Sequence, residues 1–279
     1  MGKMKIIVFG GSGMLGDILC QTLVKKNHDV TLTTRTRIPK WLPTSKKVGL
    51  IKFEVSEKLP DLSEYDYVIN CIGAIKQKNY SISDFYHLNS VFPWKLTGVC
   101  LHQGPKVIHI SSDCVFSGLS KDPYMASATM DAVDDYGLSK ALGEPYGAIV
   151  VRTSIIGPST ETFGLFEWLR NNKNQEIPGY TNHMWSGVTT LYLSQFIEQI
   201  ISKPEVDIPT TGGLFQVASQ PVSKNNLLEI INEVFGLGKT IISTQDKQDI
   251  NRVLLPSVGY APDIHSQLVY LRDWMTLNG

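Results

Sequence analysis

The feature that most constrains this chain is a glycine-rich loop directly after a short apolar segment near the N-terminus. Residues Ile6–Phe9 are β-branched or aromatic, as in a buried strand, and a helical apolar pattern begins at Met14. Gly10, Gly13 and Gly16 fall at this junction. A strand, a tight glycine turn and a helix in this order offer a diphosphate free N–H groups and the positive end of a helix. The loop therefore predicts a dinucleotide site.

A second glycine turn follows the fourth predicted strand, at residues 70–74. Gly73 would let a cofactor pass close to the backbone, although the segment is also compatible with a plain turn. The residues expected to contact the dinucleotide through these two turns are Gly10, Ser12, Gly13, Met14, Leu15, Gly16, Cys71, Gly73 and Ala74.

The end of the second predicted strand indicates which dinucleotide is bound. An acidic residue there would hold the ribose 2′-hydroxyl of NAD, but the segment 30–37 contains no acid. It contains Arg35 and Arg37, whose guanidinium groups suit a 2′-phosphate. We therefore expect NADP(H), the alternative being that both arginines are solvated loop charges.

Predicted strands alternate with segments of helical periodicity through the first half of the chain. Strands are expected over 6–9, 29–35, 48–53, 67–72, 106–110 and 148–151, and helices over 14–26, 81–102 and 135–146. This alternation is typical of an α/β protein with a doubly wound, Rossmann-type parallel sheet. The long helix should be kinked at Pro93.

The pattern loosens after Arg152, where glycine and proline pairs interrupt it. We expect residues 1–153 to form the dinucleotide-binding domain and residues 154–279 to form mainly a smaller C-terminal α/β lobe. A helix expected over 189–201 should pack on the sheet, so that the two parts interleave.

A tyrosine and a lysine with helical spacing form the catalytic candidate. Tyr136 is the only tyrosine of the chain with a lysine, Lys140, four residues on, so both lie on one helix face. A nearby ammonium favours tyrosinate and would lower the tyrosine pKa. Ser112 follows a predicted strand, at the sheet edge where ligands bind, and could hydrogen-bond a substrate carbonyl. Asn89, in the long helix, could bind a water leading to Lys140, or could simply be exposed.

Composition narrows the classes of function that remain. The 279 residues carry 26 basic and 26 acidic side chains, so no basic footprint for nucleic acid or an anionic membrane exists. The four cysteines and six histidines have no metal-binding spacing, and reduced thiols of a cytoplasmic protein are expected. The apolar run at Ile6–Phe9 is too short for a signal peptide or membrane span.

These motifs together resemble the extended short-chain dehydrogenase/reductase superfamily, and within it the dTDP-4-dehydrorhamnose reductase group. The resemblance covers nearly the whole chain. The matching residues are Gly10, Gly13, Gly16, Asn89, the segment 111–118, Tyr136–Lys140 with Gly143 and Glu144, 151–154, 187–190 and 215–219.

The resemblance implies reduction of the 4-keto group of a nucleoside-diphosphate-linked 6-deoxy sugar by NADPH, in deoxysugar biosynthesis for a surface polysaccharide. Tyr136 would protonate the oxygen, Lys140 would hold the nicotinamide ribose, Ser112 would orient the carbonyl and Asn89 would support a relay water. The implied substrate contacts are Asp113, Cys114, Phe163, Trp185 and Arg252, of which Phe163 and Trp185 could instead be core residues and Arg252 a surface charge.

Two departures from the family pattern bear on the substrate. Related dehydratases carry a second acid after Asp113 and the reductases usually carry a tyrosine, whereas this chain has Cys114. The tryptophan expected after the Arg-Thr-Ser segment is replaced by Ile155. Cys114 disfavours dehydration, and both changes alter the expected sugar contacts.

Two alternative functions and one assembly remain open. A sugar-nucleotide epimerase would share the fold, although such enzymes favour NAD and an acid at strand two. A non-catalytic, NADP-binding regulatory subunit would also share it. A homodimer through the helices near Ser81 and Tyr136 is the assembly expected from the superfamily.

Overall fold

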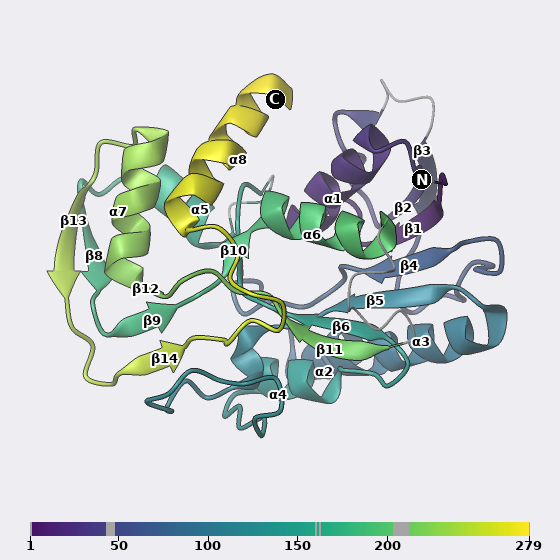
Figure 1. Cartoon of the computed structure of the whole chain (residues 1–279), viewed down its shortest axis with the longest axis horizontal. Coiled ribbons are helices and arrows are strands. Elements are labelled where there is room, and N and C mark those ends of the chain that lie inside the picture. The colour runs from purple at the N-terminus through teal and green to yellow at the C-terminus, as the bar shows by residue number, and fades with distance from the viewer. Residues whose placement is uncertain (1, 43–47, 160, 162, 203–211, 279) are drawn as a thin grey trace.

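The chain, described by a computed structural model over residues 2–42, 48–159, 161, 163–202 and 212–278, is built around a seven-stranded sheet. The strand order is β11-β6-β5-β4-β1-β2-β3, and every pair is parallel (Figure 1). The expected Rossmann-type sheet is therefore confirmed. Its strands are β1 (Lys5–Phe9), β2 (Asp29–Thr34), β3 (Val48–Lys52), β4 (Tyr67–Asn70), β5 (Lys106–Ile110), β6 (Ile149–Arg152) and β11 (Gly213–Gln216).

The central strands are apolar throughout because both faces of the sheet are covered. In β1, Ile6 and Val8 belong to the hydrophobic cluster on one face, whereas Ile7 and Phe9 belong to the cluster on the other. The strand order reverses between β1 and β4, and ligands of such sheets bind in the crevice at this point. The glycine loop lies there, at the carboxyl end of β1.

Helices cover the two faces of the sheet in two groups (Figure 1). On one face, α1 (Met14–Lys25) packs against α6 (Thr190–Ser202). On the other lie α2 (Ile82–Tyr86), α3 (Phe92–Gln103) and α4 (Asp135–Leu142).

The long helix expected over 81–102 is interrupted by a π-helical turn. A π-helical turn, His87–Val91, separates α2 from α3, and Pro93 lies in the first turn of α3. A proline is accepted there because that N–H needs no partner within the helix. The irregular turn contains Asn89, four residues before Pro93, and π-turns often occur near functional sites. The expected kink at Pro93 stays a prediction.

The C-terminal part forms three small sheets beside the main one. In one sheet β9 (His183–Trp185) lies between β12 (Val222–Ser223) and β14 (Ile250–Arg252). The other two pair β8 (Glu176–Tyr180) with β13 (Thr240–Thr244), and β7 (Ile155–Ile156) with β10 (Val188–Thr189). The helices here are α5 (Leu165–Asn171), α7 (Lys224–Phe235) and α8 (Ile264–Asn278).

Segments after residue 154 also return to the main sheet. Strand β11 pairs with β6 at its edge, and Leu193 and Ile197 of α6 are fully buried in the same hydrophobic cluster as β1. The domain boundary between residues 153 and 154 stays a prediction.

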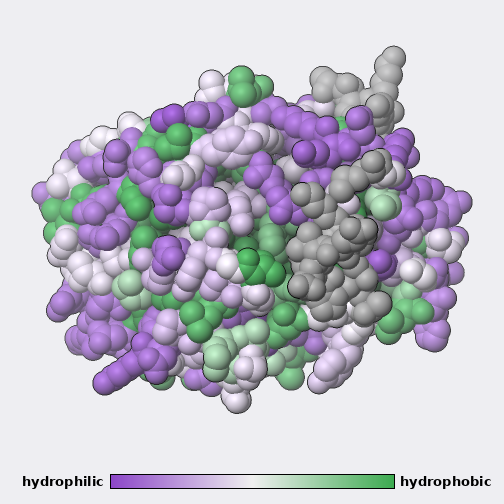
Figure 2. All heavy atoms as spheres, in the orientation of Figure 1, coloured by the Kyte–Doolittle hydropathy of each residue, from purple (hydrophilic) through white to green (hydrophobic). Residues whose placement is uncertain are grey.

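The surface in Figure 2 is mostly hydrophilic at its rim, with hydrophobic residues in separate patches. Among the described helices, none combines the length and the apolar character needed to cross a bilayer.

Candidate active site

The backbone of the glycine loop packs closely against the second turn and against the start of α1. Gly10 has φ +76°, and a Cβ there would lie 3.1 Å from the backbone nitrogen of Ile72. A Cβ on Gly16 would lie 2.2 Å from the carbonyl oxygen of Gly10. Glycine is thus required at Gly10 for conformation and at Gly16 for space. The start of α1 is thereby pressed onto the loop, with its amino end at the crevice of the sheet.

The second turn is held by Asn89. Its Oδ1 accepts a hydrogen bond from the backbone N–H of Ala74 (2.8 Å), and its Nδ2 donates to the Ala74 carbonyl (3.2 Å) and to Ser139 Oγ (3.0 Å). A Cβ on Gly73 would lie 3.2 Å from Asn89 Oδ1 and 3.8 Å from Lys140 Nζ. The fully buried Asn89 therefore ties the second turn to α4, and its role with a relay water stays a prediction.

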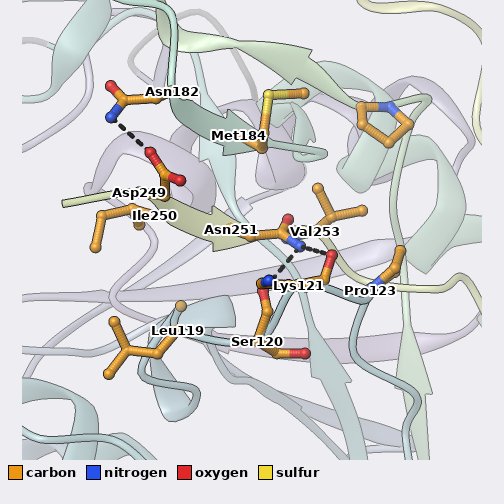
Figure 3. A pocket seen from close by; sticks show the side chains of 12 residues that line it. Leu119, Ser120, Lys121, Pro123, Asn182, Met184, Asp249, Ile250, Asn251 and Val253 are labelled. Atoms are coloured by element: carbon orange, nitrogen blue, oxygen red, sulfur yellow. Dashed lines mark hydrogen bonds between the residues drawn. The ribbon is translucent and has the colours of Figure 1, made fainter. Parts of the chain in front are cut away.

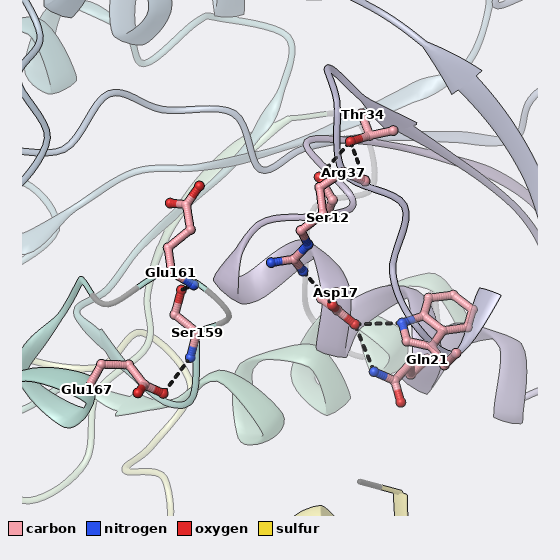
Figure 4. Close-up of polar contacts among 9 residues, drawn as sticks. Ser12, Asp17, Gln21, Thr34, Arg37, Ser159, Glu161 and Glu167 are labelled. Carbon is pink, nitrogen blue, oxygen red and sulfur yellow. Dashed lines mark hydrogen bonds and ion pairs between the residues drawn. The ribbon is translucent and has the colours of Figure 1, made fainter. Parts of the chain in front are cut away.

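The two arginines after β2 have different surroundings, and Figure 4 shows those of Arg37. Arg37 forms an ion pair with Asp17 of α1, with Nη2 and Oδ2 3.1 Å apart. Arg35 is more exposed, and its Nη1 lies 4.0 Å from Glu54. Ser12 Oγ hydrogen-bonds Thr34 Oγ1 at 2.8 Å, which places hydroxyls beside Arg37. Asp17 was not anticipated, because it comes from the first turn of α1 rather than from β2.

The catalytic candidates lie at the carboxyl end of β5 and on α4. Asp134 caps α4 by accepting a hydrogen bond from the Gly137 N–H (2.9 Å). A Cβ on Gly137 would lie 2.3 Å from the Cys114 carbonyl oxygen, so α4 approaches the turn after β5 closely. Ser112 Oγ accepts a hydrogen bond from the Cys114 N–H and donates to Asp113 Oδ1, both at 3.1 Å. This packing brings Tyr136 next to Ser112.

Lys140 is buried beneath this site. Its Nζ donates a hydrogen bond to the Ile110 carbonyl at 2.8 Å. Burial lowers the pKa of Lys140 to about 8, and Glu144 is the strongest influence in the other direction. The ammonium is therefore retained near neutral pH.

The pKa of Tyr136 is shifted in the direction opposite to the expectation. Burial raises the pKa of Tyr136 above its usual value, Cys114 raises it further, and a hydrogen bond with Ser112 lowers it. The expected lowering is wrong for this structure, because burial outweighs every influence that lowers the pKa of Tyr136. Tyr136 is accordingly a protonated phenol over a wide pH range, which suits a proton donor.

A buried ion pair supports the same edge of the sheet and was missed by sequence reasoning. Glu144 binds Arg152 through two hydrogen bonds of 2.7 Å and accepts a third, of 2.6 Å, from Ser111 Oγ. Arg152 also donates to the Ala126 carbonyl at 3.0 Å. The network ties the end of α4 to β5 and β6.

The proposed substrate contacts fall into two places. Arg252 of β14 donates through Nη1 to Cys114 Sγ at 2.7 Å, beside the buried Asp113. Trp185 is buried and donates through Nε1 to Ser154 Oγ at 2.7 Å. Phe163 is half-buried under the ammonium of Lys78, 5.7 Å from its ring centre, and precedes Gly164, which faces Met14. It therefore lies toward the glycine loop.

Two lysines near this site carry no sequence motif and were also missed. Lys76 pairs with Asp134 at 2.5 Å and lies 5.5 Å from the ring centre of Tyr136. Lys224, the first residue of α7, lies 5.2 Å from the ring centre of Trp185. In the sequence, only the preceding Ser223 marks this position, because serine is a preferred cap at the start of a helix.

A cavity of about 670 Å³ opens beside β14 (Figure 3). Asn251 closes one side by donating from Nδ2 to the carbonyls of Ser120 and Lys121, each at 3.1 Å. The cavity is also lined by Leu119, Pro123, Asn182, Met184, Pro221 and Asp249. Because β14 also carries Arg252, this cavity adjoins the catalytic candidates without containing them.

The parallel sheet, the glycine loop at its switch point and the edge that carries Ser112, Tyr136 and Lys140 define a class: a nicotinamide-dinucleotide-dependent oxidoreductase. The profile of the NAD dependent epimerase/dehydratase family matches residues 6–154, more than half of the chain. The chain belongs to this family.

Two distant curated relatives align over most of their length. The probable low-salt glycan biosynthesis reductase Agl14 of Haloferax volcanii is 25% identical, covering 89% of this chain and 86% of the relative. A dTDP-4-dehydrorhamnose reductase of Aggregatibacter actinomycetemcomitans is 22% identical, covering 78% and 74%. The crystal structure of dTDP-4-dehydrorhamnose reductase from Bacillus anthracis in complex with NADP superposes with a TM-score of 0.77 at 16% identity, covering 98% and 100%. The fold is thus shared over the whole chain.

Proposed function

We propose that this protein uses NADPH to reduce the 4-keto group of a nucleoside-diphosphate-linked 6-deoxy sugar. The observation that carries the proposal is that Tyr136 lies beside Ser112 while the buried Lys140 of the same helix donates to the Ile110 carbonyl, at the carboxyl end of β5. The absence of a carboxylate at Cys114 favours reduction over elimination. The names of the curated relatives, reductases of glycan and deoxysugar biosynthesis, support the same assignment.

The chain's own residues position the carbonyl and supply the proton. Ser112 turns its hydroxyl from Asp113 to the carbonyl oxygen, and Tyr136 donates its phenolic proton as negative charge develops on that oxygen. Lys140 keeps its positive charge on the same helix, four residues after Tyr136, and its ammonium would hold the nicotinamide ribose when the cofactor is bound. Bound NADPH supplies the hydride.

NADPH is proposed over NADH because the end of β2 offers cations and hydroxyls to a 2′-phosphate. Arg35 is the freer of the two arginines, since Arg37 is anchored by Asp17. The backbone of the second turn, at Gly73 and Ala74, would lie close to the bound cofactor. A ratio of kcat/KM values for NADPH and NADH that favours NADH would contradict this choice.

Cofactor consumption tests the reaction. NADPH oxidation is followed with dTDP-, UDP- and GDP-linked 4-keto-6-deoxy sugars, and the product is identified by NMR. Net oxidation with formation of a 4-hydroxyl supports the proposal. Interconversion of two sugars without net oxidation would indicate an epimerase. Binding of NADPH with no turnover on the whole panel would indicate a regulatory subunit.

We also propose that a second copy of the chain covers the outer face of α3 and the end of α4. Apolar side chains on this face are exposed, at Val91, Trp94, Leu101, Leu142 and Tyr146. Light scattering after size exclusion should give the mass of a dimer, and Leu142→Lys should shift it to the monomer. A monomeric wild type at micromolar concentration would contradict this assembly.

A further inference from the structure

The small sheet of β12, β9 and β14 presents a row of side chains on one face. Trp185 is the register partner of Val222 on one side and of Arg252 on the other, and register partners point to the same face. Two residues after Val222, Lys224 begins α7 and places its ammonium 5.2 Å from the ring centre of Trp185. Lys224, Trp185 and Arg252 therefore form a cation–indole–cation row.

This row faces the turn that follows β5. Arg252 contacts Cys114 Sγ at 2.7 Å, and Trp185 is fixed by its hydrogen bond to Ser154. Burial lowers the pKa of Lys224, Asp113 and Cys114 oppose that lowering, and Arg252 adds to it. Lys224, Arg252, Asp113 and Cys114 thus lie within electrostatic reach of one another, next to Ser112.

The two cations of the row have hydrogen-bonding capacity that the described residues leave unused, although the charge of Asp113 acts on both. Within the described residues, Lys224 makes no hydrogen bond or ion pair through its ammonium, and the buried Nε of Arg252 has no hydrogen-bond partner. Other cations at this edge are satisfied: Lys76 pairs with Asp134, and Arg152 pairs with Glu144. Both side chains are half-buried, and an anionic ligand would accept hydrogen bonds from the Lys224 ammonium and from the Arg252 guanidinium.

We propose that Lys224 and Arg252 together bind the diphosphate of the sugar nucleotide, with Lys224 as a substrate-binding residue that fixes how the sugar enters the site. The inference rests on the proposed function. Arg252 offers a planar fork suited to one phosphate, and Lys224 offers a point charge to the other. The indole of Trp185 forms an apolar wall between them.

The diphosphate does not change during the reaction, so binding it stabilises substrate and transition state equally. Lys224→Gln should therefore raise KM for the sugar nucleotide about 10-fold and leave kcat within a factor of two. A merely structural role would lower the thermal unfolding midpoint and kcat together instead.

Equilibrium binding tests the proposal without turnover. The NADPH-loaded protein is titrated with dTDP, UDP and GDP, and with the corresponding nucleosides, by calorimetry. Lys224→Gln should weaken binding of the best diphosphate about 10-fold and leave binding of its nucleoside unchanged. Lys224→Arg should restore affinity to within a factor of three. Lys173→Gln, a matched charge removal at an exposed loop position, should behave as wild type.

Two results would overturn the proposal in distinguishable ways. Equal diphosphate affinities for wild type and Lys224→Gln, with wild type still oxidising NADPH on a 4-keto sugar nucleotide, would remove Lys224 from the site and leave the proposed function standing. Failure of wild type to bind any of the three diphosphates would overturn the diphosphate site and the sugar-nucleotide function together. An unchanged thermal unfolding midpoint and NADPH affinity show that the Gln variant is folded.

Discussion

The two halves of this protein build their sites in opposite ways. In the N-terminal half, each functional element is local: a glycine loop, a strand end, or a tyrosine and lysine one helical turn apart. In the C-terminal half, Trp185 and Arg252 come from two short strands and Lys224 from the start of a helix, and they become neighbours only through the small sheet. A local motif can be recognised without the fold, whereas a site made by strand pairing cannot.

Replacing Tyr136 should have the largest effect on catalysis. Tyr136→Phe removes the proton donor and should lower kcat by about 10²–10⁴-fold while leaving NADPH affinity unchanged. Steady-state kinetics and a fluorescence titration of NADPH measure the two quantities. Tyr146→Phe, at a tyrosine with 86% exposure, is the matched control. Full activity of Tyr136→Phe would remove this residue from the mechanism.

Replacing Gly16 should weaken cofactor binding by the N-terminal half. The added Cβ of Gly16→Ala would lie 2.2 Å from a backbone oxygen, so the loop or α1 must move, and NADPH should bind at least about 10-fold more weakly. Gly98→Ala is the control, because a Cβ there meets nothing within 4 Å inside α3. That control should raise the free energy of unfolding by about 1 kcal/mol. Normal NADPH binding by Gly16→Ala would show that the loop is not the cofactor site.

The pKa of Lys140 links activity and stability to pH with opposite signs. If the ammonium is required, kcat/KM should fall about 10-fold per pH unit above a pKa of about 8. Below that pKa the buried charge destabilises the fold. As pH rises from about 8 toward the ordinary value of 10.5, the folded state binds fewer protons than the unfolded state, and this residue's contribution to stability increases.

Lys140→Met should abolish both pH effects. Denaturant unfolding of wild type and variant between pH 7 and pH 10 follows the stability, and initial rates over the same range follow the activity. A variant that gains no stability over wild type at pH 7 would contradict the destabilising role of the buried charge.

Replacing Trp185 should have the smallest effect and affect only the C-terminal half. Trp185→Phe loses the hydrogen bond to Ser154 and weakens the contact with Lys224, so KM for the sugar nucleotide should rise by about 3–10-fold. NADPH affinity should stay at the wild-type value. A change in NADPH affinity equal to the change in KM would mean that the two halves are not separable in this way.

The sequence predicted the sheet and several of its functional side chains, and it failed where burial or packing decided the result. Tyr136 and Lys140 were found because four residues equal one helical turn. The raised pKa of Tyr136 was not found, because it depends on burial and on the neighbouring Cys114, which the fold brings together. The π-turn around Asn89 was missed because the periodicity of apolar residues does not distinguish a π-turn from an α-helical one.

The sequence by itself determined the family, the parallel sheet and the place of the glycine loop, because apolar periodicity and glycine spacing act over a few residues. Only the tertiary structure decided that β11 completes the main sheet, that Glu144 and Arg152 support its edge, and that Lys224 stands beside Trp185 near Arg252. These contacts join residues far apart in the chain, and their energies come from burial and charge, which a one-dimensional pattern does not contain.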